Sequence, residues 1–391
     1  MANKNLTNAK RKKNDEFYTQ WTDIEKEVNA YLEYDENVFK GKTILLPCDD
    51  PEWSNFTKFF ASRFEKFGIK KLISTSYASS SKSYDTNYQP TMFESTNPEY
   101  DESKTITNGK IFTLDRDVTN DGKIDINDLK WHYLEGDGDF RSDEIKALRD
   151  DADIIITNPP FSLFKEFIPW IMEANKQFSI IGNMNSIGLQ ELFKYIKENK
   201  IWLGQSISSG DREFQVPDSY PLDAATWRID NNGNKFLRVK GVRWFTNIDH
   251  GRRHQPLQLM SMEDNLRFNK KLKKDIEKGK EPYIKYENYN AIEVPFTNAI
   301  PSDYKDIMGV PISFLDKYNP DQFEILGKCE NMDYFNLKSK VYLKEECKKA
   351  YSDKFGKKGT YDLNASGVIY SNGLLEKVYT RILIKHRIKE K

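Results

Sequence analysis

The sequence has few cysteines, few histidines and no long apolar run. Its three cysteines (Cys48, Cys329 and Cys347) are too scattered for a disulfide framework or a zinc cluster. Four histidines show neither metal-ligand spacing nor a partner for nucleophilic catalysis. No apolar run reaches the roughly 18 residues that a membrane span needs, and no apolar segment follows the basic N-terminus. These absences exclude a secreted disulfide scaffold and predict a cytoplasmic protein with no membrane partner.

A net charge is also lacking, because 60 Lys and Arg balance 60 Asp and Glu. The distribution is uneven: residues 251–391 carry 27 basic against 20 acidic side chains, and residues 1–250 carry 33 against 40. A positive excess suits a polyanionic partner, although chance asymmetry would give the same pattern. We expect two domains, 1–250 and 251–391, with the second suited to phosphate contacts.

Short apolar runs alternate with amphipathic stretches from about residue 42 to 203. This pattern predicts an α/β fold with a mainly parallel sheet. The expected strands are 43–46, 71–75, 153–157, 178–181 and 201–203. The expected helices are 54–67, 162–174 and 189–199. Residues 76–141 are rich in Ser, Thr, Asn, Asp and Gly and predict an insertion beside the sheet. Beyond residue 250, the pattern predicts a charged helix over 264–280 and a strand over 378–385.

The tetrapeptide Asn158-Pro159-Pro160-Phe161 follows a buried strand directly, and ligands bind at the carboxyl ends of strands in such sheets. Two prolines fix two φ angles and remove two N–H donors. The rigid loop can present the Asn158 side-chain oxygen and a backbone carbonyl to one amine nitrogen, aiming its lone pair at an incoming methyl group. Phe161 offers a face for an extruded base, and such stacking is worth about 1–3 kcal/mol. The alternative is a tight strand-to-helix turn capped by Ser162.

This tetrapeptide resembles the catalytic motif of amino-group methyltransferases, and other segments narrow the resemblance to the EcoRI-type adenine-specific DNA methyltransferase family. In chain order these segments are KNDEFYTQWTDIEKEV, LLPCDDPEWSNFTKFF, GDGDFRSDE, DADIIITNPPFSLFKEFIPWI, FSIIGNMNSI, KENKIWLG, VRWFTNIDHGRRH and MGVPISFLDKYNPDQFEILG. The similarity covers nearly the whole chain and is weakest over about 78–130 and 331–365.

The resemblance implies a Rossmann-like class I methyltransferase fold with a C-terminal target-recognition region and a gamma-like motif order. The implied activity is methylation of adenine N6 in double-stranded DNA, with S-adenosylmethionine as cofactor and the target base flipped out of the duplex. The enzyme would belong to a restriction–modification system, beside a restriction endonuclease, or act as an orphan modification enzyme.

The resemblance also implies cofactor-binding residues. Phe17, Tyr18 and Thr19 stand where the family covers the methionine end of the cofactor; an aromatic helix staple is the alternative. Asp139 and Phe140 match the position where an acidic group accepts the cofactor's adenine amine; a polar turn is the alternative. The cofactor's amino acid and ribose would be held by Asp49, Asp50, Pro51, Ser54, Asn55 and Phe56.

Two features depart from the usual methyltransferase pattern. Carboxylates suit the ammonium and sulfonium charges of the cofactor, but the loop at Asp49 and Asp50 lacks the usual glycines. Which of the two aspartates contacts the cofactor stays open, as does the alternative that both cap the next helix. No acidic residue closes the second strand, so the usual ribose ligand is not identifiable.

Candidate DNA contacts lie near the boundary between the two expected domains. Trp244 or Phe245 is a candidate second wall around the flipped base, with ordinary core packing as the alternative. Arg252, Arg253 and the Tyr- and Asn-rich stretch 286–290 are candidate base-edge contacts, because base discrimination needs bidentate side chains in the major groove.

The segment 117–128 resembles an EF-hand or dockerin-type calcium loop, with Gly122 at its sixth position. The candidate ligands are Asp117, Thr119, Asp121, Lys123 (through its carbonyl), Asp125 and Asp128. Thr119 is a poor ligand, and the last position holds Asp rather than Glu. An Asp-rich surface turn is the alternative; a bound calcium ion would have a structural role.

Two rival functions remain at this point. An RNA or protein-glutamine amide methyltransferase would use a similar motif, but the glutamine enzymes usually carry Tyr after the prolines and a glycine-rich cofactor loop. A catalytically dead DNA-binding module is the non-enzyme rival, and a cofactor-binding titration would identify it.

Overall fold

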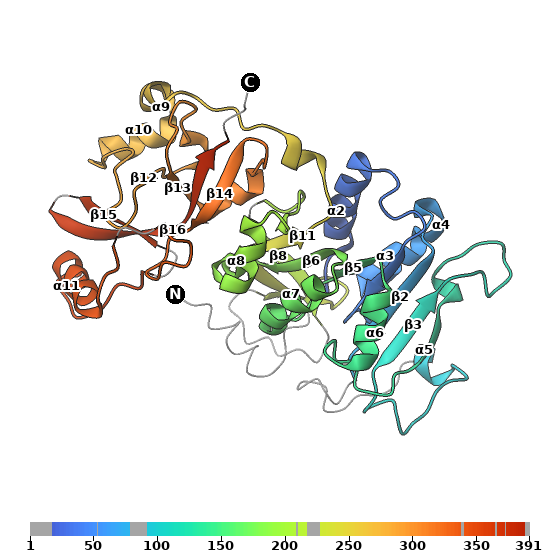
Figure 1. The fold of residues 1–391 in the computed structure, drawn as a ribbon. Helices are drawn as coiled ribbons and strands as arrows, with labels where there is room; N and C mark the ends of the chain where they lie inside the picture. Colours follow the sequence, from blue (N-terminus) through green and yellow to red (C-terminus); the bar gives the residue numbers. More distant parts are fainter. Residues whose placement is uncertain are drawn as a thin grey trace. The chain divides into compact units, whose positions relative to one another are not determined.

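The computed structural model describes residues 18–52, 54–78, 92–208, 210–216, 227–337, 340–363, 366–371 and 373–387. The chain divides into two compact units (Figure 1). The first comprises Met1–Leu192 and Ile201–Gly251, and the second comprises Phe193–Lys200 and Arg252–Lys391. Within the described ranges, no helix has both the length and the apolar character to span a bilayer.

The first unit is built on an eight-stranded sheet in the order β4-β3-β2-β1-β5-β6-β11-β7. The strands are β1 (Thr43–Leu46), β2 (Lys71–Ser76), β3 (Lys110–Leu114), β4 (Lys130–Tyr133), β5 (Ile154–Thr157), β6 (Gln177–Asn183), β7 (Trp202–Leu203) and β11 (Val242–Thr246). Four central strands, β2, β1, β5 and β6, pair in parallel. The prediction of an α/β fold with a mainly parallel sheet is therefore confirmed.

Helices connect these strands as the amphipathic stretches indicate. They are α2 (Trp21–Tyr34), α3 (Asn55–Ser62), α4 (Phe64–Phe67), α5 (Met92–Ser95), α6 (Asp143–Asp151), α7 (Phe164–Glu173) and α8 (Gln190–Lys197). The helix expected over 54–67 is divided at Arg63, which has non-helical dihedral angles, and it ends at Gly68 with φ of 63°. That left-handed conformation favours glycine and terminates helices. Aromatic side chains such as Phe39 and Phe60 fill the core beneath α3 and α4.

The segment expected as an insertion, 76–141, contributes two strands to the sheet instead of only lying beside it. β3 pairs antiparallel with β2, and β4 pairs antiparallel with β3, so β4 runs parallel to β2 at the sheet's edge. The burial of β3 follows from its apolar run. β4 was not predicted, because its four residues, KWHY, show too little alternation to mark a strand.

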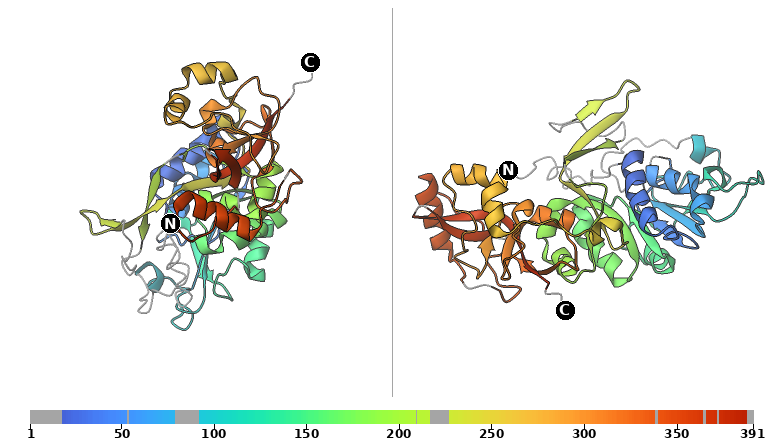
Figure 2. Two further views of the ribbon diagram at one scale, coloured as in Figure 1. Left: turned by 90° about the vertical axis from the view of Figure 1, so that its left-hand side faces the viewer. Right: turned by 90° about the horizontal axis from the view of Figure 1, so that it is seen from above.

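A separate three-stranded antiparallel sheet lies in the chain between β7 and β11. Its order is β8-β10-β9, with β8 (Asp211–Val216), β9 (Trp227–Ile229) and β10 (Lys235–Lys240). In the right-hand view of Figure 2, the yellow-green strands of this sheet extend from the body of the first unit. No local sequence pattern predicts this sheet.

The second unit holds another sheet, in the order β12-β13-β16-β14, with β15 paired to β16. Its strands are β12 (Ile292–Glu293), β13 (Met308–Pro311), β14 (Phe323–Lys328), β15 (Ser366–Ser371) and β16 (Leu374–His386). Its helices are α9 (Met262–Phe268), α10 (Lys270–Glu277) and α11 (Lys344–Phe355). The strand expected over 378–385 lies within β16. The helix expected over 264–280 is broken at Asn269, whose side chain accepts hydrogen bonds from the first turn of α10.

Candidate active site

Several strands of the first unit end at the same edge of its sheet. β1, β2 and β5 run in parallel, and β4 has the same direction through its two antiparallel pairings. Their carboxyl ends therefore lie at the same edge, where ligands bind in open α/β sheets. The loops that follow these strands contain most of the residues singled out in the sequence.

The carboxylate of Asp49 connects two of these loops. Cys48 has φ of 72°, which turns the chain sharply after β1, and the Asp49 backbone N–H donates to Thr75 of β2 at 2.8 Å. One carboxylate oxygen accepts from Ser54 Oγ at 2.7 Å and the other from Thr157 Oγ1 at 2.6 Å. Asp49 is only 5% exposed. Both oxygens of this carboxylate thus hold the protein's own loops together.

Asp50 has a different environment. It is half-buried, and one carboxylate oxygen accepts the backbone N–H of Glu52 at 2.9 Å. Ser54 begins α3 as its N-cap, accepting from the backbone N–H of Phe56 at 3.1 Å. Pro51 and Phe56 are buried. Of the two neighbouring aspartates, Asp50 is therefore the more accessible to a ligand.

The segment expected to cover the cofactor lies beside this loop. Phe17 lies outside the described residues. Tyr18 forms an antiparallel bridge with Gln215 of β8, with N–O distances of 2.9 and 3.1 Å. The Thr19 carbonyl accepts a hydrogen bond from Asn55 Nδ2 at 2.8 Å. The structure thus brings together candidate cofactor residues from the N-terminal segment and from the loop after β1.

The Asn158-Pro159-Pro160-Phe161 loop follows β5, and all four of its residues are buried. Asn158 is 8% exposed. Phe161 begins a short 3-10 helix that leads into α7. Its ring lies perpendicular to that of Phe214 in β8, with centroids 6.4 Å apart. The loop is therefore held firmly between β5, α7 and β8.

The Asp139 turn lies against the end of β2. Gly138 has φ of 81°, and a Cβ atom there would come within 2.3 Å of the Ser76 carbonyl oxygen, so only glycine fits. The Asp139 carboxylate pairs with Arg141 through two hydrogen bonds of 2.9 and 2.6 Å. Arg141 also bonds Glu166 of α7 at 2.7 Å. The hydrogen bonds that Arg141 donates, first to Asp139 and then to Glu166, raise the pKa of Arg141.

Phe140 has a packing role. It is fully buried and lies against Phe167 and Trp170 of α7, with ring centroids 4.9 and 5.6 Å away. The aromatic cluster fixes the Asp139 turn relative to the helix that follows Asn158.

Trp244 and Phe245 occupy the core of the first unit. Trp244 is 1% exposed and packs against Phe56, with centroids 5.9 Å apart. Phe245 is fully buried and packs against Phe164 at 5.4 Å. All five residues of β11 are buried, so its side chains are covered on each face of the sheet. This is the arrangement of core aromatics, and we do not assign these two residues to a base-binding wall.

The candidate DNA-contacting residues of the second unit differ in how far they are exposed to solvent. Arg253 is 6% exposed and donates to Asn199 Oδ1 at 2.6 Å, whereas Arg252 is half-buried. In the stretch 286–290, Asn288 is 1% exposed and accepts the backbone N–H of Val368 at 2.9 Å. In this group Arg252 is half-buried, and Glu287 and Asn290 are exposed.

The calcium expectation is not supported. Across the described ranges, no group of three or more His, Cys, Asp or Glu side chains is placed to hold a metal ion. Asp117 accepts the backbone N–H groups of Asn120 and Gly122 at 2.6 and 2.9 Å. The Asp128 carboxylate accepts three backbone N–H groups of the same loop, at 2.8, 2.9 and 3.0 Å. These carboxylates hold the loop's own backbone, as aspartates do in surface turns.

Several residues of the site were missed in the sequence. Thr157 had a weak signal, as the polar end of a strand otherwise made of isoleucine. Arg141 had one too, as a cation two positions after Asp139. Phe214 and Gln215 of β8 had none, because nothing in a short alternating segment identifies partners that lie far away in the chain.

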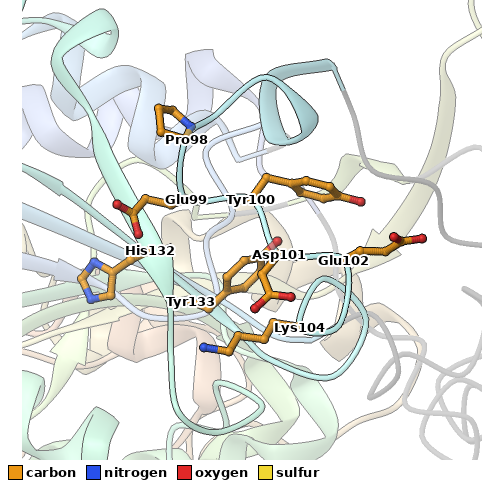
Figure 3. Close-up of a pocket in the computed structure, with 8 residues that line it drawn as sticks. All are labelled: Pro98, Glu99, Tyr100, Asp101, Glu102, Lys104, His132 and Tyr133. Carbon is orange, nitrogen blue, oxygen red and sulfur yellow. The ribbon is translucent and has the colours of Figure 1, made fainter.

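A separate hollow lies outside this site (Figure 3). Its lining residues are Pro98, Glu99, Tyr100, Asp101, Glu102, Lys104, His132 and Tyr133. The Asp101 carboxylate accepts the Ser103 hydroxyl and backbone N–H at 2.6 and 2.9 Å, which lowers the pKa of Asp101. None of the candidate catalytic or cofactor residues lines this hollow.

Comparison with known proteins bears directly on this site. The family described as "Adenine-specific methyltransferase EcoRI" matches residues 5–387. Type II methyltransferase M.EcoRI from Escherichia coli is 40% identical over 336 residues, which cover 86% of this chain and 92% of that protein. Type II methyltransferase M.MpnI from Mycoplasma pneumoniae is 33% identical over 325 residues, covering 83% and 85%. No solved structure matches the chain significantly. The match over nearly the whole length shows that the chain belongs to the EcoRI family of adenine-specific methyltransferases.

Proposed function

We propose that the chain transfers a methyl group from S-adenosylmethionine to N6 of an adenine flipped out of double-stranded DNA, with Asn158 as the residue that accepts the amine. The observation that carries this proposal is the link between the loops after β1 and β5. Thr157, immediately before Asn158, donates to Asp49 of the cofactor-side loop at 2.6 Å. Donor and acceptor sites would thereby be held at a fixed spacing, which a direct transfer requires.

The residues beside this loop fit the cofactor. Within the described part of the chain, the buried Thr19 Oγ1 and Gln20 Nε2 atoms have no hydrogen-bond partner. Buried polar atoms without partners are costly, and the polar groups of a bound ligand would satisfy them. Asp50 is half-buried and is the candidate for the cofactor's ammonium group. S-adenosylmethionine, when bound, supplies an electrophilic methyl group.

Asn158 would act on the adenine amine in two ways. Its side-chain oxygen and a backbone carbonyl of the Pro-Pro segment accept the two amine hydrogens, which turns the nitrogen lone pair away from the ring. The same acceptors stabilise the positive charge that develops on the nitrogen. Because the prolines restrict the loop, this geometry costs little reorganisation. Phe161 forms the apolar wall at the end of the loop.

The DNA partner imposes a further requirement. A base stacked inside a duplex cannot reach a buried loop, so the adenine must be flipped out. Residues 251–391, with their positive excess, would hold the phosphate backbone, and Arg252 is the candidate contact near their start. We expect a cytoplasmic enzyme that acts beside a restriction endonuclease or as an orphan.

The test is Asn158→Ala, measured by transfer of radiolabelled methyl groups to plasmid DNA and by calorimetric titration with S-adenosylmethionine. Because the amide acts in the transition state, kcat should be lost while cofactor affinity stays within a few-fold. Asn127→Ala, at an exposed position, is the matched control and should behave as wild type. Near-normal turnover of Asn158→Ala would overturn the assignment of this loop.

A further inference from the structure

The three-stranded sheet β8-β10-β9 has two faces of different character. Residues paired directly across antiparallel strands lie on the same face, so the register assigns each side chain. On one face, Arg228 pairs with Glu213 at 2.9 Å and its guanidinium lies 4.3 Å from the centre of the Phe236 ring. Arg238 pairs with Asp211 on this same face at 3.2 Å. Both carboxylates on this face, those of Glu213 and Asp211, are thus paired within the sheet.

The opposite face leads to the catalytic loop. Trp227 of β9 is paired with Leu237 of β10, and Leu237 is paired with Phe214 of β8. Phe214 in turn contacts Phe161. Neighbouring strands are about 4.8 Å apart, so the row Trp227–Leu237–Phe214 spans about 10 Å. Its inner end, Phe214, is the residue that contacts Phe161.

The outer end of this face is apolar and open to solvent. Trp227 and Ile229 are each 49% exposed, and Ile229 is paired with Lys235. Large apolar side chains that stay exposed next to a site commonly mark a binding surface. On this face the three strands carry two basic side chains, Arg212 and Lys235, and no acidic one, which favours a polyanionic partner. Figure 2 shows these strands extending from the body of the first unit.

We propose that Trp227, Ile229 and Lys235 form a DNA-contacting surface for the strand that carries the target adenine. Trp227 stacks on a base next to the flipped adenine, Ile229 contacts the same stack, and Lys235 lies at a neighbouring phosphate. Nucleic acid combines apolar base faces with regularly spaced phosphates, which matches an aromatic, an aliphatic and a cationic side chain on one face of a sheet. The first unit thereby contributes to DNA binding in addition to residues 251–391. This inference rests on the proposed function, because it takes a flipped adenine as the substrate.

The experiment measures affinity for a duplex that the wild-type enzyme methylates, chosen by sequencing methylated plasmid DNA. Trp227→Ala should weaken binding by about 5- to 150-fold, the range that loss of one base–aromatic stack gives. Trp227→Phe should restore most of the affinity, since it keeps an aromatic face. The matched control is Tyr34→Ala, because Tyr34 is 48% exposed but precedes the amino end of β1, and its DNA affinity should not change. Cofactor affinity should be the same in all four proteins and reports correct folding.

A second variant tests the charge. Lys235→Ala should reduce the slope of log affinity against log salt concentration by about 0.9, the value for one phosphate contact. If Trp227→Ala binds the duplex as tightly as wild type and wild type methylates it, the assignment of this face to DNA binding is wrong, whereas the proposed function stands. If wild type is a dimer and Trp227→Ala is a monomer with the same DNA affinity, this face is an interface between copies of the chain and the proposal fails. If wild type does not methylate DNA, the proposed function itself fails.

Discussion

The hydroxyl of Thr157 donates a hydrogen bond to the carboxylate of Asp49 over 2.6 Å, although the two residues lie 108 positions apart in the chain. Asp49 belongs to the loop after β1, and Thr157 is the last residue of β5. Both side chains are buried. Because Asn158 directly follows Thr157, this bond fixes the position of the Asn158 amide, the proposed amine acceptor, relative to the loop after β1.

Replacing Thr157 by Val should therefore damage both stability and turnover. Valine keeps the shape of threonine but leaves a buried carboxylate oxygen without this donor, which should lower the free energy of unfolding by about 1.5–3 kcal/mol. Misplacement of Asn158 should lower kcat by about 10- to 100-fold. Urea unfolding and methyl-transfer kinetics measure the two effects. Thr113→Val, in β3 of the same sheet, is the control and should change neither. A stability loss with unchanged kcat would show that the bond does not position Asn158.

Replacing Gly138 by Ala should disrupt the Asp139 turn. Any L-residue there pays about 1–2 kcal/mol for the left-handed conformation, and the new methyl group would lie 2.3 Å from the Ser76 carbonyl oxygen. Gly233→Ala is a matched control, because its φ of 85° is similar and nothing lies within 4 Å of an added Cβ. The Gly138 variant should lose about 1–3 kcal/mol more than the control in urea unfolding. Equal losses would mean that the turn shifts freely and that close packing against β2 is unimportant.

The central strands and the Asn158–Phe161 loop are predictable because their signals are local. The strand Thr43–Leu46 is an apolar run that stops at a proline, and the strand before Asn158 is a run of isoleucines that stops at two prolines. The parallel order then places both loops at one edge of the sheet.

Features that depend on distant partners are not predictable in this way. The sequence offers two adjacent aspartates. Only the three-dimensional position of Thr157 shows that the Asp49 carboxylate is hydrogen-bonded to another loop of the protein. The sheet β8-β10-β9 depends on pairings between separate short segments with no individual signal. The aromatic pair Trp244 and Phe245 was ambiguous for a related reason, because aromatic side chains serve cores and base-binding walls alike.

In the second unit, Arg381→Met should be strongly destabilising. Arg381 and Glu293 are 9% and 6% exposed and pair at 2.9 Å, and the Tyr286 hydroxyl also donates to Glu293. Removing one partner of a buried pair leaves an uncompensated charge and typically costs about 3–5 kcal/mol. The control is Lys349→Met, which breaks a pair with Asp353 on the solvent side of α11 and should cost less than about 0.5 kcal/mol. Chemical unfolding followed by circular dichroism measures both, and similar small losses would mean that the buried pair relaxes into solvent.

The Asp128 carboxylate should make the free energy of unfolding depend on pH in the acid range. Hydrogen bonds from backbone N–H groups, that of Asp125 first, lower the pKa of Asp128 to about 2, whereas an unfolded chain has a value of about 3.9. A carboxyl group with a depressed folded-state pKa stabilises the protein above its unfolded pKa, and the contribution is lost as the pH falls through the folded value. The difference in unfolding free energy between wild type and Asp128→Asn should therefore be constant from about pH 7 to 5 and shrink from about pH 4 towards 2. Asp121→Asn, at an exposed position of the same loop, should show no such trend. Adding a calcium chelator should leave the difference unchanged, because backbone N–H groups already satisfy the carboxylate; a difference that vanishes with chelator would instead establish a metal in the loop.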